Sequence, residues 1–278
     1  MRYDTLAKPA SVAVVNLRAW IQEYNPVVVY ACFSGGHDSL VSTHITMSVI
    51  PDATVLHIDT GIGVRATRDF VKQTCARHNW PLLVISAEEC GQSYEQLVLE
   101  NGFPGPAQHR IMFNRLKERA IYKACRIAKT GRPRLSTVAF VSGLRAEESR
   151  QRKTYGADPR KIYSQVWMSP IYQFTAKDKN DYMTRHNLQA NPVVELLGMS
   201  GECLCGAYAH KGEKSKIALV DPTTVAEIER IEAVVAERGF TWGWEDPGPN
   251  ADWKEQRNGQ MLLFTPLCVG CEKVALDD

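Results

Sequence analysis

Short apolar runs alternate along the chain with longer segments in which apolar residues recur at helical spacing. The run 27–32 is apolar throughout and follows Pro26, which indicates a strand buried on both faces, as in parallel sheets. Similar runs predict strands at 53–60, 82–86 and 135–142. Strands that alternate with helices predict an α/β fold, doubly wound around a mostly parallel sheet.

Helical spacing predicts the segments between and after these strands. Helices are expected at 1–25, 64–78 and 109–129, and a further helix opens with Thr175 as its N-cap. Between the strand at 82–86 and the helix at 109–129, the sequence FPGPAQH is interpreted as an irregular surface connection and a candidate lid or substrate loop.

The pattern changes near residue 197 and predicts two units. Residues 1–197 form the α/β domain, and residues 198–278 form a small helical unit that carries cysteines. Its main helix is expected to begin at Asp221 and Pro222 and to stop at Gly239.

The first strand runs into a turn with two adjacent glycines, and a helix follows the turn. Two glycines at a helix N-terminus let the backbone approach an anion closely, and the first-turn N–H groups attract it. We therefore predict a phosphate site there, with Asp38 either capping the helix or holding Mg²⁺. An ordinary turn with an Asp-Ser cap is the alternative, which the order of strand, turn and helix disfavours. The turn residues are Ser34, Gly35, Gly36, His37, Asp38 and Ser39.

The second predicted strand ends in Asp59, Thr60 and Gly61. Ligands of open α/β sheets lie outside the carboxyl ends of the strands, so these residues are expected beside the glycine turn. Asp59 as the N-cap of the helix at 64–78 is the alternative.

Gly143, Arg145 and Arg152 follow the strand at 135–142. A glycine at a strand end followed by arginines indicates a second group of phosphate ligands, because guanidinium binds phosphate oxygens bidentately. A charged helix start is the alternative.

Composition and charge narrow the class of protein. The chain has 278 residues, is 44% hydrophobic and carries a net charge of +2. No apolar run has the length of a membrane span and the N-terminus lacks a signal-like succession, so a cytoplasmic protein without membrane contact is expected. Residues 108–161 hold fifteen Lys and Arg against four Asp and Glu. This basic segment suits a polyanionic partner, a nucleotide or a nucleic acid, as well as a solvated helix face.

Four of the eight cysteines form two close pairs, Cys203 with Cys205 and Cys268 with Cys271. If the pairs converge, four thiolates can ligate zinc or an iron–sulfur cluster. One alternative is that the four cysteines are unrelated buried thiols. Another is that Cys205 or Cys271 is a redox nucleophile.

The turn sequence SGGHDS resembles the PP-loop of the ATP pyrophosphatase superfamily, whose fold is adenine nucleotide alpha hydrolase-like. Within it, IDTG at 58–61 and the pattern G-x-R-x-x-E-S-x-x-R resemble the PAPS reductase family, close to DndC-type sulfurtransferases. The likeness is continuous from about Val27 to Cys205. The family's mid-chain cysteines are replaced by Met112 and Phe113, so chemistry tied to them is lacking. The pattern is matched by Gly143, Arg145, Glu148, Ser149 and Arg152.

The resemblance implies an enzyme that binds ATP at residues 34–39 and cleaves it to AMP and pyrophosphate. It would activate a substrate, a nucleic acid among the candidates, for sulfur transfer, with Asp38, Ser39 and Arg145 catalytic. The implied cofactors are Mg²⁺ and a [4Fe–4S] cluster, with Zn²⁺ as the alternative, and a sulfur-donor protein is an implied partner. Reduction of PAPS or APS to sulfite is the alternative function, and a non-catalytic nucleotide-binding subunit is a further one.

Overall fold

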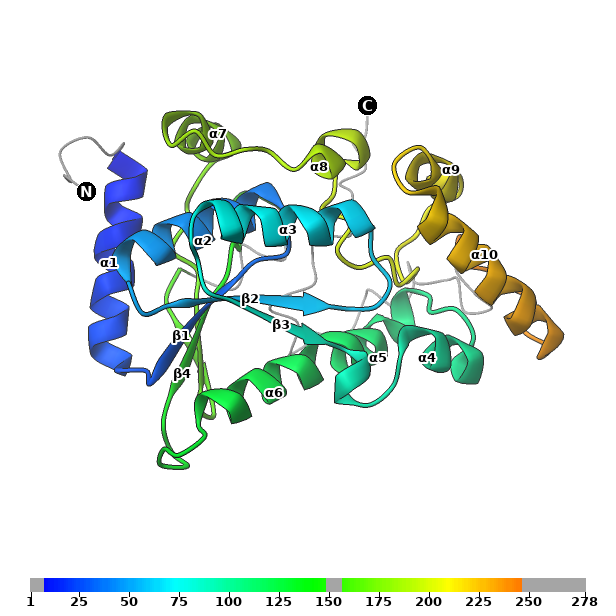
Figure 1. The fold of residues 1–278 in the computed structure, drawn as a ribbon, viewed down its shortest axis with the longest axis horizontal. Coiled ribbons are helices and arrows are strands. Elements are labelled where there is room, and N and C mark those ends of the chain that lie inside the picture. Colours follow the sequence, from blue (N-terminus) through cyan, green and yellow to red (C-terminus); the bar gives the residue numbers. More distant parts are fainter. Residues whose placement is uncertain (1–7, 149–156, 247–278) are drawn as a thin grey trace, which may run out of the picture.

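The computed structural model describes residues 8–148 and 157–246. Its centre is a six-stranded sheet with the order β3-β2-β1-β4-β6-β5 (Figure 1). All neighbouring pairs are parallel except β5 and β6, which form an antiparallel hairpin. The strands are β1 (Val28–Cys32), β2 (Thr54–Asp59), β3 (Leu82–Ser86), β4 (Val138–Val141), β5 (Arg160–Ile162) and β6 (Gln165–Met168).

Helices cover both faces of the sheet, which confirms the doubly wound α/β prediction. In Figure 1, α2 and α3 lie on one face and α6 lies on the other. None of the described helices is long and apolar enough to cross a membrane. The helices are α1 (Lys8–Tyr24), α2 (His37–Val49), α3 (Arg65–Arg77), α4 (Tyr94–Asn101), α5 (His109–Phe113), α6 (Arg119–Ala128), α7 (Ala176–Arg185), α8 (Pro192–Leu197), α9 (Glu213–Ala218) and α10 (Pro222–Glu237).

Alternation of side chains along the strands divides the core into two clusters. In β4, Ala139 and Val141 pack with residues of α1, α2 and α7, whereas Val138 and Phe140 pack with residues of α6. All four side chains are at most 1% exposed. A strand buried on both faces must be apolar throughout, which explains the continuous hydrophobic runs.

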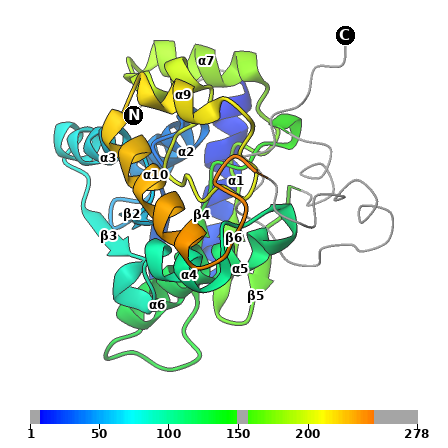
Figure 2. The same ribbon diagram turned by 90° about the vertical axis from the view of Figure 1, so that its right-hand side faces the viewer.

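A third cluster joins the C-terminal helices to the middle of the chain. Side chains of α10 pack with α4 and with the loops around it, and Figure 2 shows α10 running toward α4. Trp244 is 2% exposed at the centre of this contact. The described residues after 197, up to 246, are therefore packed against the α/β domain, while the boundary at residue 197 stays a prediction.

The prediction of a surface connection at FPGPAQH was wrong for the first part of the segment, whereas residues 106–108 are partly or fully exposed. Residues 102–105 are buried, and Phe103 is 1% exposed. The Phe103 carbonyl accepts a hydrogen bond of 2.9 Å from Trp242 Nε1. Pro and Gly mark an irregular backbone, but the aromatic side chain between them anchors the loop under the C-terminal segment.

Three histidines meet where α2, α3 and α7 come together. The His44 ring lies 5.0 Å from His186 and 5.9 Å from His78 between centroids, and His44 Nδ1 is 2.8 Å from the Tyr182 hydroxyl. Burial, with the neighbouring His186 and His78 charges, lowers the pKa of His44 from 6.5 to about 4. Burial also lowers the pKa values of His78 and His186.

We expect this cluster to make the free energy of unfolding decrease as the pH is lowered. Its histidines are protonated more readily in the unfolded chain, so stability is lost as the pH falls below 6.5, down to the folded pKa of about 4 for His44. His44 contributes about 3 kcal/mol to this loss. Urea denaturation between pH 7.5 and 4.5 measures it. His44→Gln should flatten the pH dependence, while His210→Gln, at an exposed position, should leave it unchanged. An equal slope in both variants would contradict the assignment.

Candidate active site at the carboxyl edge of the sheet

The predicted glycine turn lies between β1 and α2. Gly35 has φ +83°, a conformation that side chains rarely adopt, and a Cβ there would lie 2.6 Å from Thr67 Cγ2. Gly36 is the N-cap of α2, and no side chain caps the helix. The first-turn N–H groups of α2 therefore point at space that a ligand can enter.

Side chains inside the turn hold its shape. The Ser39 hydroxyl donates to the Gly36 carbonyl at 2.8 Å and lies 3.1 Å from the Ser34 hydroxyl. Asn191, which is fully buried, donates from Nδ2 to the Gly35 carbonyl at 3.0 Å. The turn is thus fixed from both sides before any ligand binds.

A cavity of about 370 Å³ opens in front of this turn. One wall is the turn itself together with Gly143, at the end of β4. A second wall consists of residues 198–203, and the remaining lining combines apolar side chains with the charged residues Lys117, Glu148 and Lys179. A cavity of this size and position, outside the carboxyl ends of β1 and β4, is a typical ligand site of an open α/β sheet. The apolar lining includes Phe33, Leu56, Ile58, Ile121 and Trp167.

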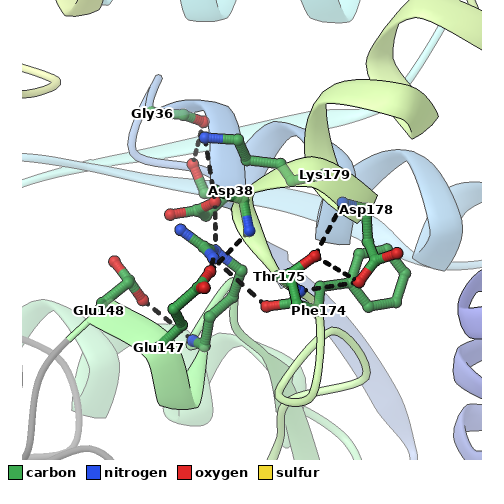
Figure 3. Close-up of polar contacts among 11 residues, drawn as sticks. Gly36, Asp38, Glu147, Glu148, Phe174, Thr175, Asp178 and Lys179 are labelled. Carbon is green, nitrogen blue, oxygen red and sulfur yellow. Dashed lines mark hydrogen bonds and ion pairs between the residues drawn. The ribbon is translucent and has the colours of Figure 1, made fainter.

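Arg145 lies behind the cavity rather than in its lining. Its side chain is 8% exposed, and its Nε donates to Asp38 Oδ1 at 2.7 Å. The same guanidinium donates from Nη1 to Glu147 at 3.0 Å and to the Phe174 carbonyl at 3.3 Å. Figure 3 shows this group of side chains at the start of α2. The structure therefore uses Arg145 to hold Asp38, and its predicted contact with phosphate is not part of this arrangement.

Asp59, Thr60 and Gly61 do not line the cavity either. Asp59 accepts hydrogen bonds from the Gly61 N–H and from Arg68 Nη1, both at 3.0 Å. Thr60 is 1% exposed. The alternative for Asp59 was also wrong, because Val64 is the N-cap of α3. The sequence predicted correctly that these residues lie at the carboxyl end of β2, but their side chains do not line the cavity.

The loop after β2 instead fixes the second wall of the cavity. The Val64 N–H donates to the Gly201 carbonyl at 2.8 Å, and the Leu204 N–H donates to the Ile62 carbonyl at 2.7 Å. The Thr60 hydroxyl donates to the Glu202 carbonyl at 3.0 Å. These bonds connect residues 198–204 to the loop after β2, so this segment is held in place as part of the cavity wall.

Two lysines in the cavity lining were missed by the sequence analysis as site residues. Lys117 belongs to a π-helical stretch, Asn114–Glu118, between α5 and α6, and its Nζ lies 2.7 Å from Glu202. Such π-helical turns recur at functional sites. Lys179, on α7, also lines the cavity, with its Nζ 3.8 Å from Asp38. A charged residue in a helix gives no sequence signal of the direction in which it points.

The Asp38 carboxylate, the expected Mg²⁺ ligand, lies beside two cationic side chains. Arg145 and Lys179 both lie against its Oδ1. A cation that binds through Oδ1 has to displace one of them, and Mg²⁺ at the turn stays a prediction.

The structure describes only two of the four cysteines that were predicted to bind a metal. Cys203 lines the cavity and Cys205 is 7% exposed, whereas Cys268 and Cys271 lie outside the described residues. Within the described ranges, no group of three or more His, Cys, Asp or Glu side chains is placed to hold a metal ion. A [4Fe–4S] cluster or zinc therefore stays a prediction. Arg152 and Ser149 also lie outside the described residues.

Comparisons with known proteins point to one family. The family described as "Phosphoadenosine phosphosulfate reductase domain" matches residues 28–197. An adenosine 5'-phosphosulfate reductase of Bacillus cereus is 29% identical over 179 residues, which are 63% of this chain and 70% of that protein. The enzyme of the same name from Geobacillus thermodenitrificans is 27% identical over 202 residues, 68% of this chain and 80% of that protein.

Two solved structures share the fold. A phosphoadenylyl-sulfate reductase from Candida auris, in complex with phosphate, superposes with a TM-score of 0.50 at 18% identity, over 66% of this chain and 84% of that one. The NH3-dependent NAD synthetase of Campylobacter jejuni gives a TM-score of 0.50 at 14% identity, over 86% of this chain and 96% of that one. These likenesses confirm the expected doubly wound α/β fold.

Proposed function

Because this chain belongs to the phosphoadenosine phosphosulfate reductase domain family, a family of enzymes, we propose that it is a sulfonucleotide reductase. Its substrate is adenosine 5'-phosphosulfate or the 3'-phosphorylated form, and its product is sulfite. The observation that carries the proposal is the shared cavity: the glycine turn forms one wall and Cys203 lies in the other. A phosphate-binding backbone and a thiol then face the same substrate.

The dimensions and lining of the cavity suit such a nucleotide. Its apolar portion, with Trp167 and Ile121, can take the adenine, and the turn at the other wall can take the 5'-phosphosulfate. Asp38, already neutralised by Arg145, favours an anion that arrives without Mg²⁺. ATP cleavage to pyrophosphate relies on Mg²⁺ to hold the leaving group, so this arrangement favours the reductase over the ATP-cleaving activity.

The reaction needs two electrons, which an external dithiol supplies. A thiolate attacks the sulfur of the phosphosulfate, the bond from sulfur to the bridging oxygen breaks, and the nucleoside 5'-monophosphate leaves. A second thiol then attacks the resulting S-sulfonate, so that sulfite is released and a disulfide forms. The nucleotide itself is not oxidised. Cys32 and Cys203 both line the cavity. Burial raises the pKa of the Cys32 thiol to about 12, which disfavours a thiolate there, so Cys203 is the proposed nucleophile.

Sulfite release separates this proposal from its alternatives. Purified protein with adenosine 5'-phosphosulfate, its 3'-phosphorylated form and a dithiol should produce sulfite and AMP, or 3'-phosphoadenosine 5'-phosphate, in equal amounts. A parallel assay with ATP and Mg²⁺, with and without DNA or RNA, should release no pyrophosphate. Release of pyrophosphate without sulfite would instead support ATP activation for sulfur transfer. If neither assay gives product, a non-catalytic nucleotide-binding subunit is favoured.

A Cys203→Ser variant tests the role of the cavity thiol within the same assay. Cys75 provides the matched control, because it is also a described cysteine but is 2% exposed in the core beside α1 and α2. We expect Cys203→Ser to lower sulfite release and Cys75→Ala to keep it. Equal loss in both variants would point to a general effect on folding.

A further inference from the structure

The start of α7 is tied to the network behind the cavity. Thr175 and Asp178 form a capping box, with the Asp178 N–H donating to the Thr175 hydroxyl at 3.1 Å. The Ala176 N–H donates to Glu147 at 2.6 Å, and Glu147 also accepts from Arg145. The first turn of α7 is therefore held in place by the same residues that hold Asp38. The position of the next residue on this turn, Lys179, is fixed as a consequence.

Lys179 occupies the inner face of α7. It shares this face with Tyr182 and Met183, which are 6% and 8% exposed. Its own side chain is 15% exposed, and Figure 3 shows it extending toward Gly36 and Asp38 at the glycine turn. By contrast, Lys177 is 82% exposed and pairs with Asp181 on the outer face. Two lysines that are two residues apart thus have opposite surroundings.

Charge at the turn indicates what Lys179 does there. Asp38 has a closer partner in Arg145, at 2.7 Å, than in Lys179, at 3.8 Å. Burial, together with the Lys179 charge, lowers the pKa of His37, so this histidine is neutral at pH 7 and adds no positive charge. Among the described residues, Lys179 is consequently a cationic side chain of the cavity lining that lies beside the N-terminus of α2. A largely desolvated ammonium group at such a place is stabilised by an anion.

We propose that Lys179 binds the phosphate or sulfate oxygens of the nucleotide at the Gly35–Gly36 turn. This inference rests on the proposed function for the identity of the ligand. It gives Lys179 the phosphate contact that the sequence assigned to Arg145, and it leaves Arg145 as the residue that positions Asp38. The ammonium group and the first-turn N–H groups of α2 would bind the same anionic group from two directions.

Binding measurements with matched lysine variants test this role. We compare wild type, Lys179→Met, Lys179→Arg and the control Lys177→Met by calorimetric titration with adenosine 5'-phosphosulfate, ATP and adenosine. Lys179→Met should weaken binding of adenosine 5'-phosphosulfate on the order of 10- to 100-fold, the effect of losing a charge-assisted hydrogen bond. Lys179→Arg should recover part of this loss, and Lys177→Met should bind as wild type does. Adenosine, which carries no phosphate, should bind all four proteins alike.

The outcomes separate the two proposals. If Lys179→Met binds adenosine 5'-phosphosulfate as tightly as wild type does, the inference is overturned while the proposed function stands. If wild type binds ATP but not the sulfonucleotide, and the ATP affinity depends on Lys179, the proposed function fails and the lysine assignment stands. Binding of neither nucleotide by wild type overturns both. A parallel loss of adenosine and sulfonucleotide affinity in Lys179→Met would show a distorted cavity and overturn the direct contact.

Discussion

Replacing Asp38 by asparagine is expected to destabilise the protein by about 3 kcal/mol and to abolish nucleotide turnover. The Arg145 guanidinium loses the carboxylate at 2.7 Å while its side chain remains 8% exposed. Its remaining ion-pair partner, Glu147, is 52% exposed and offers a weaker, more screened interaction. Turnover should be lost because Asp38 lies in the first turn of α2, at the proposed phosphate site, and its ion pair with Arg145 holds that turn. Urea denaturation and the sulfite assay measure the two effects.

An exposed ion pair supplies the control for this change. Asp181 pairs with Lys177 on α7, and both side chains are at least half exposed. Asp181→Asn should change the free energy of unfolding by less than about 1 kcal/mol and leave sulfite release intact. Similar losses of stability in both variants would show that burial of the Asp38–Arg145 ion pair does not increase its contribution to the free energy of unfolding.

Changing Gly36 to alanine should preserve the fold but lower nucleotide affinity by at least about tenfold, or 1.4 kcal/mol. Gly36 has φ −78°, which alanine adopts readily, and the nearest atoms to an added Cβ are 3.6 Å away, at Ser200 and Ser34. The methyl group therefore fits the protein itself. It would nevertheless stand in the cavity at the point where a phosphate has to approach the backbone. Titration with adenosine 5'-phosphosulfate, beside thermal unfolding, separates the two properties.

The neighbouring glycine should behave in the opposite way. Gly35→Ala combines a left-handed backbone, φ +83°, with a Cβ only 2.6 Å from Thr67 Cγ2, so it should cost about 2–4 kcal/mol of stability. Normal affinity in Gly36→Ala would mean that the ligand does not reach the turn. Equal destabilisation in the two variants would mean that the turn is constrained by packing alone.

Features that depend on chain order could be predicted from the sequence. The strand at 28–32, the glycine turn and α2 follow directly from an apolar run, two glycines and a helical segment. Thr175 was predicted as an N-cap and Asp221 with Pro222 as the start of a helix, and the structure confirms both. Local rules suffice in these cases because the interactions concerned lie within a few residues.

Features that depend on which side chains meet in space could not be predicted. Arg145 and Asp38 are far apart in the sequence, and nothing in either segment shows that they pair. Phe103 was assigned to a surface loop because the segment that buries it comes much later in the chain. The direction of Lys179 depends on the rotation of α7, which its contact with Glu147 helps to fix. The partners that the basic segment was expected to attract remain a prediction as well.

The position of residues 198–204 determines when, during synthesis of the chain, the cavity can form. Their backbone bonds to Ile62 and Val64 connect the second half of the cavity to a loop that leaves the ribosome much earlier. A nascent chain that has completed all six strands has its glycine turn but still lacks the second wall. Under the proposed function, competence to enclose a nucleotide therefore arises only after residues 198–204 have been synthesised.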